Sequence, residues 1–264
     1  MKKNEKIFEI LKKYDYPDAS GLIYINEFTF LVAIILSAQA RDEFVNTQTR
    51  ELFKVAPTAE EMVELGLDGI CTFINKIGLW RNKGANIYKM AGQICELKKM
   101  SQSQAREWYN EISQKYFNQE GDLVDDLELF EKDFSRKVVC IDGSEPVFGL
   151  DSSEILSNEG VPKFRLGLLK LAGIGRKSAN VFLNFVYGAK VFPVDTHVVR
   201  LTNRLGIAEG NPEKIEKILQ EVVPENFAEH ASNWLVWHGR RVCFARKPNC
   251  LDCLLKNYCN FFKK

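Results

Sequence analysis

Apolar side chains recur every three or four positions along most of this sequence, a spacing that predicts helices rather than strands. The longest apolar run, from Phe28 to Ala38, is expected to form a helix at the centre of a core. Before residue 98 the pattern predicts at least six helices and no convincing strand. These helices are expected over residues 5–14, 27–40, 43–53, 58–65, 67–76 and 81–97. The pattern therefore predicts an all-α fold.

The second half of the chain returns to the helical pattern after an unusual middle segment. Residues 118–160 hold twelve Asp or Glu against three Lys or Arg, a net charge of −9. A helix over 101–118 and a short strand over 137–141 are expected, and low hydrophobicity near 142–159 predicts partial disorder. Further helices are expected over residues 196–205, 212–222 and 227–241.

Polar residues mark where several of these helices begin. Thr58 and Glu61 have the spacing of a capping box, in which each side chain bonds the other residue's backbone amide. Asn211 before Pro212 combines a favoured N-cap with a favoured first helical residue. Asp42 is expected to cap the helix that follows it.

The segment from Leu171 to Asn180 is expected to form a helix, a tight hairpin and a second helix. Gly173 and Gly175 break the helical spacing and tolerate positive φ. The amides that open the second helix lack intrahelical partners and lie at the positive end of its dipole, which suits a phosphate. Gly173, Gly175 and Arg176 are therefore candidates for holding a nucleic-acid backbone. An ordinary turn between helices with a glycine C-cap is the structural alternative.

Lys177 stands in the first turn of that second helix, where the helix dipole disfavours a cation. The dipole and Arg176 favour the neutral amine, which is the nucleophilic form of lysine. Asp195 follows about eighteen residues later, ahead of an apolar helical run, where a carboxylate is a good N-cap. Because a carboxylate can cap a helix and still face Lys177, both are candidate catalytic residues.

Four of the seven cysteines lie within seventeen residues near the C-terminus, with the spacing C-x6-C-x2-C-x5-C. The odd cysteine count and the lack of an export signal indicate a reducing compartment, so these thiols predict a metal site rather than disulfides. Zinc and iron–sulfur clusters both take four thiolates, and the spacing does not separate them. The four candidate ligands are Cys243, Cys250, Cys253 and Cys259.

These motifs together resemble the helix-hairpin-helix DNA glycosylases, in particular the endonuclease III branch. The resemblance rests on residues 171–180, on 194–197, on Leu36-Ser37-Ala38-Gln39-Ala40-Arg41-Asp42, on Ile77-Gly78-Leu79 and on the cysteine spacing. It covers roughly residues 5–97 and 160–260. Ala172 stands where the family usually has proline, and Ser178 where it usually has threonine. The family joins the two covered parts much more directly, so residues 98–158 are an insertion.

The resemblance implies a two-domain, all-α helix-hairpin-helix glycosylase fold with an iron–sulfur cluster loop and an acidic insertion. A helical-barrel domain is expected over 20–189, with the insertion at about 98–158, and a second domain from 1–19 and 190–264. The cysteines would hold a [4Fe–4S] cluster, and DNA would lie between the domains. The residues implied to contact DNA are Gln39, in the gap left by an extruded nucleotide, Leu79, as a wedge in the opposite strand, and Arg246 and Lys247, on phosphates.

The implied activity is removal of a damaged base, an oxidised pyrimidine, followed by β-elimination at the abasic site. Lys177 would attack the sugar C1′, and Asp195 would stabilise the sugar cation and manage protons around the lysine. One alternative is a glycosylase for adenine or mismatched thymine, although the adenine enzyme lacks a lysine at the position of Lys177. The other is a non-catalytic DNA-binding protein, against which the coincidence of Lys177 and Asp195 argues.

Charge and composition are compatible with this hypothesis. The net charge is +1, but outside residues 118–160 the chain carries +10, and residues 234–264 alone carry +6. A basic body suits double-stranded DNA, whereas the acidic insertion could face a protein partner. The longest apolar run is too short to span a bilayer. We expect a monomeric cytoplasmic protein, associated with the nucleoid if bacterial.

Overall fold

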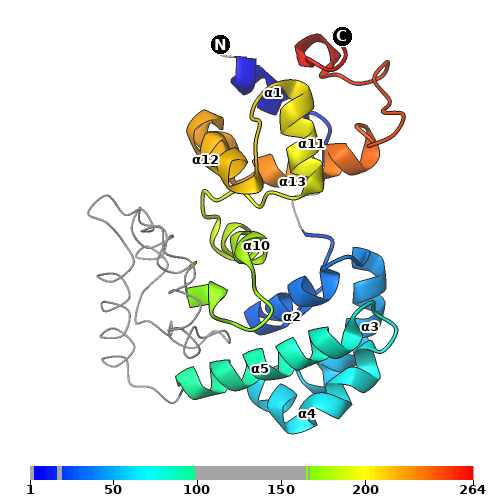
Figure 1. Cartoon of the computed structure of the whole chain (residues 1–264), viewed down its shortest axis with the longest axis vertical. Coiled ribbons are helices and arrows are strands. Elements are labelled where there is room, and N and C mark those ends of the chain that lie inside the picture. The colour runs from blue at the N-terminus through cyan, green and yellow to red at the C-terminus, as the bar shows by residue number, and fades with distance from the viewer. Residues whose placement is uncertain (1–2, 17–19, 99–164, 166, 264) are drawn as a thin grey trace, which may run out of the picture. The chain divides into compact units, whose positions relative to one another are not determined.

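The described residues fold into helices joined by short connections, which confirms the all-α prediction (Figure 1). The computed structural model describes residues 3–16, 20–98, 165 and 167–263. The helices are α1 Lys3–Lys12, α2 Glu27–Ser37, α3 Asp42–Val55, α4 Ala59–Ile74, α5 Trp80–Lys98, α10 Arg176–Tyr187, α11 Thr196–Leu205, α12 Pro212–Val222, η1 Glu225–Phe227, α13 Ala228–Arg241 and η2 Lys256–Tyr258. None of the described helices is long and apolar enough to cross a membrane. The predicted insertion at 98–158, its helix and its strand lie outside the described residues.

The chain divides into two compact units. One comprises residues 21–182 and holds the glycine hairpin, and we call it the hairpin unit. The other comprises residues 1–20 and 183–264, and we call it the terminal unit because it contains both ends of the chain. The division falls within α10.

The hairpin unit is built around α2, whose residues from Phe28 to Leu36 are all buried. A helix that is apolar on every side has to be surrounded by others, and α2 packs against α3 and α5. Two helices were expected, over 58–65 and 67–76. The structure confirms the break between them, because within α4 Gly66 has a non-helical backbone with φ +72° and ψ 168°. The glycine supplies the left-handed backbone that this break requires.

The terminal unit buries one face each of α1, α11, α12 and α13 around a common core. The stacked rings of Phe8 and Phe227 bring the first helix onto the last part of the chain, with centroids 6.4 Å apart. Lys3 Nζ also donates to the carbonyl of Leu205 at 2.8 Å. Distant segments of the sequence therefore have to meet before this core closes.

Two of the three predicted helix starts are confirmed. Thr58 and Glu61 form the reciprocal capping box, and Asn211 caps α12 with Pro212 behind it. The prediction for Asp42 was wrong, because Arg41 occupies the N-cap position and Asp42 is the first residue of α3. A carboxylate in the first turn still interacts favourably with the helix dipole, so Asp42 stabilises the start of α3 as its first residue instead of as its N-cap.

Candidate functional site

The glycine hairpin directs the start of α10 toward solvent. Gly173 has φ +83°, and a Cβ at this position would lie 3.0 Å from the Asn86 Cβ, so a larger residue meets both backbone strain and crowding. The Gly175 carbonyl accepts the first helical bond of α10, from the Ala179 amide at 2.9 Å. Lys177 is therefore the second residue of the helix, and its side chain is exposed.

A buried glutamine on α5 holds the approach to this hairpin. Gln93 donates from Nε2 to the carbonyl of Lys170 at 3.0 Å and accepts from the amide of Ala172 at 2.9 Å. With only 8% of its surface exposed, Gln93 satisfies two backbone groups that the hairpin leaves unpaired. Gln93 was not among the predicted site residues, although a polar residue at a buried helix position was a usable signal.

Two exposed turns elsewhere in the hairpin unit have left-handed backbone at non-glycine residues. Gln39 has φ +58° and follows α2, and Leu79 has φ +61° and precedes α5. Leu79 exposes 63% of its surface. Backbone strain of about 1–3 kcal/mol per residue persists where the surroundings impose it, and such residues cluster at functional sites. Both were predicted as DNA-contacting residues.

Asp195 caps α11 in the terminal unit. Its Oδ1 accepts hydrogen bonds from the amides of His197 at 2.8 Å and Val198 at 2.9 Å, as the N-cap alternative expected. Capping uses one of the two carboxylate oxygens, so it is compatible with a second role. Next to it, burial lowers the pKa of His197, while the charge of Asp195 raises it to a smaller extent. Asp195 and Lys177 belong to different units.

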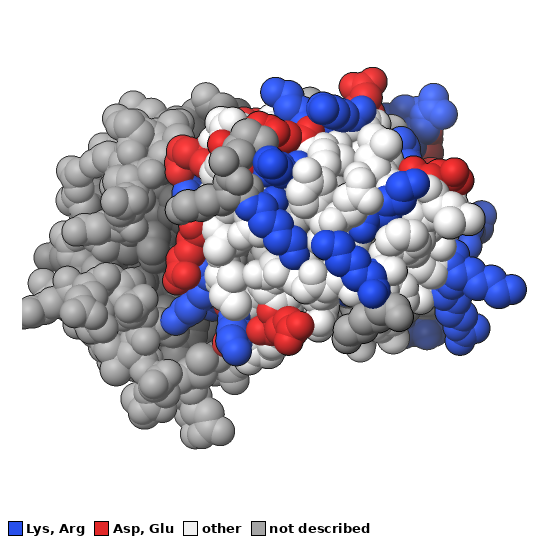
Figure 2. Space-filling view, turned by 90° about the horizontal axis from the view of Figure 1, so that it is seen from above, with Lys and Arg blue, Asp and Glu red and all other residues white. Residues whose placement is uncertain are grey.

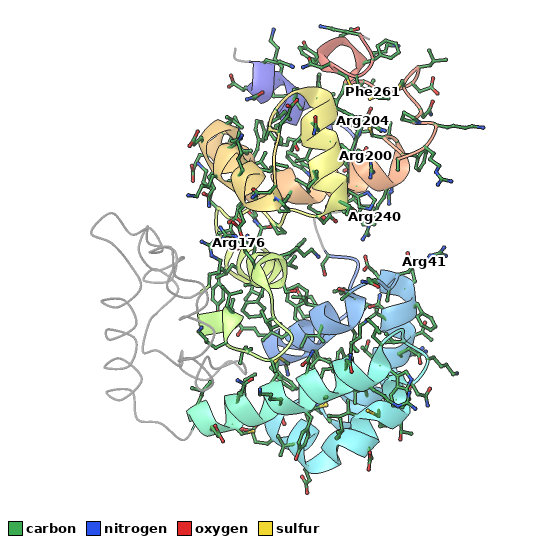
Figure 3. The ribbon with its side chains drawn as sticks, in the orientation of Figure 1. Arg41, Arg176, Arg200, Arg204, Arg240 and Phe261 are labelled. Carbon is green, nitrogen blue, oxygen red and sulfur yellow. The ribbon has the colours of Figure 1, made fainter. Side chains whose placement is uncertain are left out.

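Two arginines of α11 hold the loop that follows α13 (Figure 3). Arg200 donates from Nε to the Cys243 carbonyl at 3.1 Å. Arg204 donates to the carbonyls of Phe244 at 2.8 Å and Ala245 at 3.0 Å. The ring of Phe261 lies under its guanidinium, 4.4 Å away. Charge-assisted bonds of this kind are about twice as strong as neutral ones, so α11 fixes where this loop begins.

The loop itself presents Arg246 and Lys247, both exposed, and Lys247 has φ +50°. On the face shown in Figure 2, Lys and Arg side chains lie among acidic and uncharged ones rather than forming a uniform basic surface. Outside residues 118–160 the chain carries a net charge of +10, so basic groups such as Arg246 and Lys247 are available to an anionic partner.

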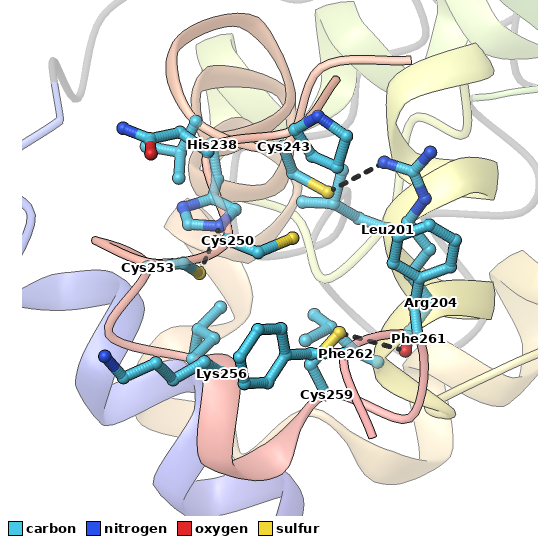
Figure 4. Close-up of a pocket in the computed structure, with 15 residues that line it drawn as sticks. Leu201, Arg204, His238, Cys243, Cys250, Cys253, Lys256, Cys259, Phe261 and Phe262 are labelled. Carbon is cyan, nitrogen blue, oxygen red and sulfur yellow. Dashed lines mark hydrogen bonds between the residues drawn. The ribbon is translucent and has the colours of Figure 1, made fainter. Parts of the chain in front are cut away.

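The four C-terminal cysteines line one pocket (Figure 4). Arg204 donates from Nη1 to Cys243 Sγ at 3.2 Å, and Cys259 Sγ donates to the Arg204 carbonyl at 3.3 Å. Burial raises the pKa of the Cys250 and Cys253 thiols. No group of three or more His, Cys, Asp and Glu within the described ranges is placed to hold a single metal ion.

A chain of aromatic groups supports one of these cysteines. His238 is buried and its pKa is lowered to about 4, so the ring is neutral at pH 7. Its Nδ1 lies 2.8 Å from the Tyr16 hydroxyl, and its Nε2 lies 3.5 Å from Cys253 Sγ. Tyr14 stacks on Tyr16, and its hydroxyl lies 3.9 Å from the same sulfur. The surroundings of Cys253 are therefore ordered by side chains from both ends of the sequence.

Comparison with known proteins decides the family. The family described as HhH-GPD superfamily base excision DNA repair protein matches residues 32–225. The chain belongs to this family. Endonuclease III of Rickettsia felis is 35% identical to it over 258 residues, which cover 97% of this chain and 93% of that protein. Endonuclease III of Escherichia coli K12 is 32% identical over 263 residues, covering 99% and 97%.

Solved structures agree with this assignment. A trapped covalent endonuclease III–DNA intermediate matches with a TM-score of 0.67 and 26% identity, over 100% of this chain and 98% of that one. A thermostable thymine-DNA glycosylase, at 15% identity and a TM-score of 0.65 over 99% and 97% of the two chains, shares the fold. The chain is an endonuclease III-type base excision repair glycosylase, so the non-catalytic alternative is excluded.

The structure brings together some of the predicted residues of this glycosylase. The hairpin unit contains Gln39, Leu79 and the hairpin from Gly173 to Lys177, whereas the terminal unit contains Asp195, the basic loop and the cysteines. Arg200 and Arg204 were missed, although their spacing of four residues on a predicted helix places them on one face. Their loop-holding role depends on contacts across some forty residues, which no local pattern reveals.

Proposed function

We propose that this glycosylase removes an oxidised pyrimidine from double-stranded DNA and cleaves the resulting abasic site, with Lys177 as nucleophile and Asp195 as its acid–base partner. The Lys177 amine attacks the sugar C1′, the bond from C1′ to the base breaks, and the base leaves. The adduct opens to an imine between Lys177 and the sugar. Loss of a C2′ proton then breaks the bond between C3′ and its oxygen, which cuts the strand on the 3′ side.

The position of Lys177 carries this proposal. An exposed lysine at the second residue of α10 lies directly behind a glycine hairpin whose helix N-terminus suits a DNA phosphate. Phosphate binding at Gly173 and Gly175 would hold the backbone next to the amine without selecting a sequence. A related endonuclease III has been trapped as a covalent intermediate with DNA, which supports a nucleophile belonging to the protein.

Asp195 is suited to the charge that develops on the sugar. Its carboxylate is already oriented by two backbone bonds at the start of α11, so little reorganisation is needed during the reaction. It would stabilise the cationic sugar as the base leaves and move protons to and from Lys177. The hairpin unit and the terminal unit thus each contribute one catalytic residue and act as the two domains of the enzyme.

Three further contacts extract and hold the damaged nucleotide. Gln39 fills the space left by the extruded nucleotide, and Leu79 wedges into the opposite strand, as an exposed apolar side chain on a strained turn permits. Arg246 and Lys247 bind phosphates from the loop that α11 holds. Preorganising this loop reduces the entropy lost when DNA binds.

The cysteine pocket is the proposed site of a [4Fe–4S] cluster. Zinc and an iron–sulfur cluster can both be held by four thiolates, and the four cysteines line one pocket. The similarity to endonuclease III favours the cluster over zinc. Cys243, Cys250, Cys253 and Cys259 would hold the cluster, which supplies a structural tie for the basic loop.

Borohydride trapping tests the nucleophile. With an abasic-site duplex, the wild-type chain should form a covalent adduct, because borohydride reduces the imine. Lys177→Gln should eliminate the adduct and keep DNA binding. Lys217→Gln, which removes an exposed lysine from α12, should trap like the wild type. An adduct of normal yield with Lys177→Gln would assign the chemistry to another amine.

A set of duplexes that each carry one lesion tests the substrate class. Oxidised thymine and cytosine should be excised in single turnover faster than a thymine mismatched with guanine or an adenine opposite an oxidised guanine. Preferential excision of mismatched thymine would replace the proposed specificity and leave the lysine mechanism intact.

A further inference from the structure

Lys83 is a buried cation that none of the proposed chemistry uses. It lies in the second turn of α5 and exposes 6% of its surface. Its Nζ donates to the carbonyl of Leu36 at 2.9 Å and to that of Ala38 at 2.6 Å. Burial lowers the pKa of this amine. A buried lysine costs free energy unless it is well bonded, so its place has to be explained by these two acceptors.

Both acceptors belong to the turn that presents Gln39. Leu36 lies at the end of α2, and Ala38 is its C-cap with φ −57° and ψ 114°. The Ala40 amide donates to the Ser37 carbonyl at 3.0 Å, and Gln39 between them has φ +58°. This is the geometry of a type II turn, whose third residue is normally glycine. A glutamine there is strained. Lys83 bonds the Leu36 and Ala38 carbonyls, which come just before the strained residue in the chain.

The backbone of Lys83 is tied to the other strained turn. Its amide donates to the Leu79 carbonyl at 3.0 Å, which is the first helical bond of α5. One residue thus bonds the turn of Leu79 through its backbone and the turn of Gln39 through its side chain. The two turns are therefore linked through one residue, in addition to the packing of α2 against α5.

We propose that Lys83 is a positioning residue that holds Gln39 and Leu79 in register, so that the two side chains enter DNA as one rigid pair. The inference rests on the proposed insertion of both residues. A pair fixed before binding loses less entropy when it enters the helix, and small misplacements of such groups can cost about 10²-fold in rate. Lys83 touches neither DNA nor the reacting sugar in this mechanism.

The test compares Lys83→Met with the wild type. The variant keeps the apolar stem and removes the donors, so single-turnover excision from a lesion duplex should fall at least about tenfold. Binding to undamaged duplex should change little, because phosphate contacts supply it. When the lesion is opposite a one-nucleotide gap, extrusion meets no paired base, and the defect should shrink. A purely structural defect would slow both substrates equally.

A double-mutant cycle separates positioning from other effects. In a chain that already carries Gln39→Ala and Leu79→Ala, Lys83→Met should add less than about twofold, because nothing remains to be positioned. If Lys83→Met lowers the excision rate in that background by the same factor as in the wild type, the inference is wrong. If the two alanine changes themselves leave excision unchanged, the proposed insertion fails instead, so the two failures are distinguishable.

Controls keep the result interpretable. Lys89→Met removes an exposed lysine from the same helix and should leave excision and melting temperature unchanged. Lys83→Gln, which retains one amide donor, should show an intermediate rate and serves in the cycle if Lys83→Met does not fold. Amide exchange should accelerate at Ala40 and remain slow at Ile87 and Ile94; unchanged protection at Ala40 would contradict the proposed support.

Discussion

Two regions of this glycosylase carry exposed residues with left-handed backbone that we propose to contact DNA, and they are supported in different ways. The turns at Gln39 and Leu79 end and begin helices of the hairpin unit, and the buried Lys83 joins them. The loop of Lys247 instead begins at Cys243 in the terminal unit and is held by Arg204. The first region is complete once the helices pack, whereas the second borders the cysteine pocket that we propose holds an iron–sulfur cluster.

This difference teaches where each region is vulnerable. Helix ends anchored by buried bonds fold with the core, so they fail only when the core or the anchor fails. The cysteine loop exposes apolar groups such as Leu251 at 75% and Leu254 at 53%, and has little core of its own. Metal binding to such a loop is coupled to its folding. The two regions should therefore respond oppositely to core mutations and to cluster removal.

The largest effect is expected from changing Asp195, the N-cap residue of α11. Asp195→Asn keeps an oxygen that caps α11 well, but removes the charge. Excision in single turnover should fall by about 10²-fold or more, the scale of a positioned acid–base group. The melting temperature should stay close to that of the wild type. A drop in stability with normal chemistry would leave Asp195 as an N-cap alone.

Removing one cysteine should break the loop region selectively. Cys250→Ser should eliminate absorbance at about 400 nm, which iron–thiolate charge transfer gives. Affinity for DNA should fall about tenfold as Arg246 and Lys247 lose their fixed position, equivalent to about 1.4 kcal/mol. Amide protection around Ala40 and Lys83 should persist. A colourless wild-type protein with full activity and one zinc per chain would disprove the cluster.

A milder change to the same region removes its arginine support. Arg204→Met should weaken DNA binding about fivefold, because two charge-assisted bonds to the Phe244 and Ala245 carbonyls disappear. The excision rate of fully bound substrate should change less than the affinity. Equilibrium titrations at several salt concentrations measure this, and an unchanged affinity would show that the cysteines alone order the loop.

The smallest effect is expected from a helix cap of the hairpin unit that lies outside the proposed contacts. Thr58→Ala removes the capping box of α4 and should lower the free energy of unfolding by about 0.5–2 kcal/mol. Excision and DNA affinity should be those of the wild type at a temperature where the variant is folded. Loss of activity without loss of stability would tie α4 to DNA binding.

Local signals predicted much of this fold because they act over a few residues. The apolar spacing predicted α2 and α5, and the cap residues predicted the starts of α4 and α12, since each depends on side chains within one or two turns. Asp42 was misplaced by one position because the backbone, not the side chain, decides where α3 starts. The motif resemblance identified the family, while the roles of Lys177 and Asp195 await the experiments above.

The sequence by itself determined the helical class, the glycine hairpin, the cysteine set and the candidates for the catalytic residues, because these lie in short motifs with fixed spacing. Only the tertiary structure decided what supports them. Lys83 and Gln93 are polar residues among the buried positions of α5, and only the fold shows that they bond carbonyls of distant turns. The sequence pattern gives Arg204 as a surface charge, and only the fold shows that it bonds the loop after Cys243. In each case a side chain bonds backbone carbonyls that their own helix or turn leaves unpaired. Which side chain meets which carbonyl depends on how distant segments of the chain pack together.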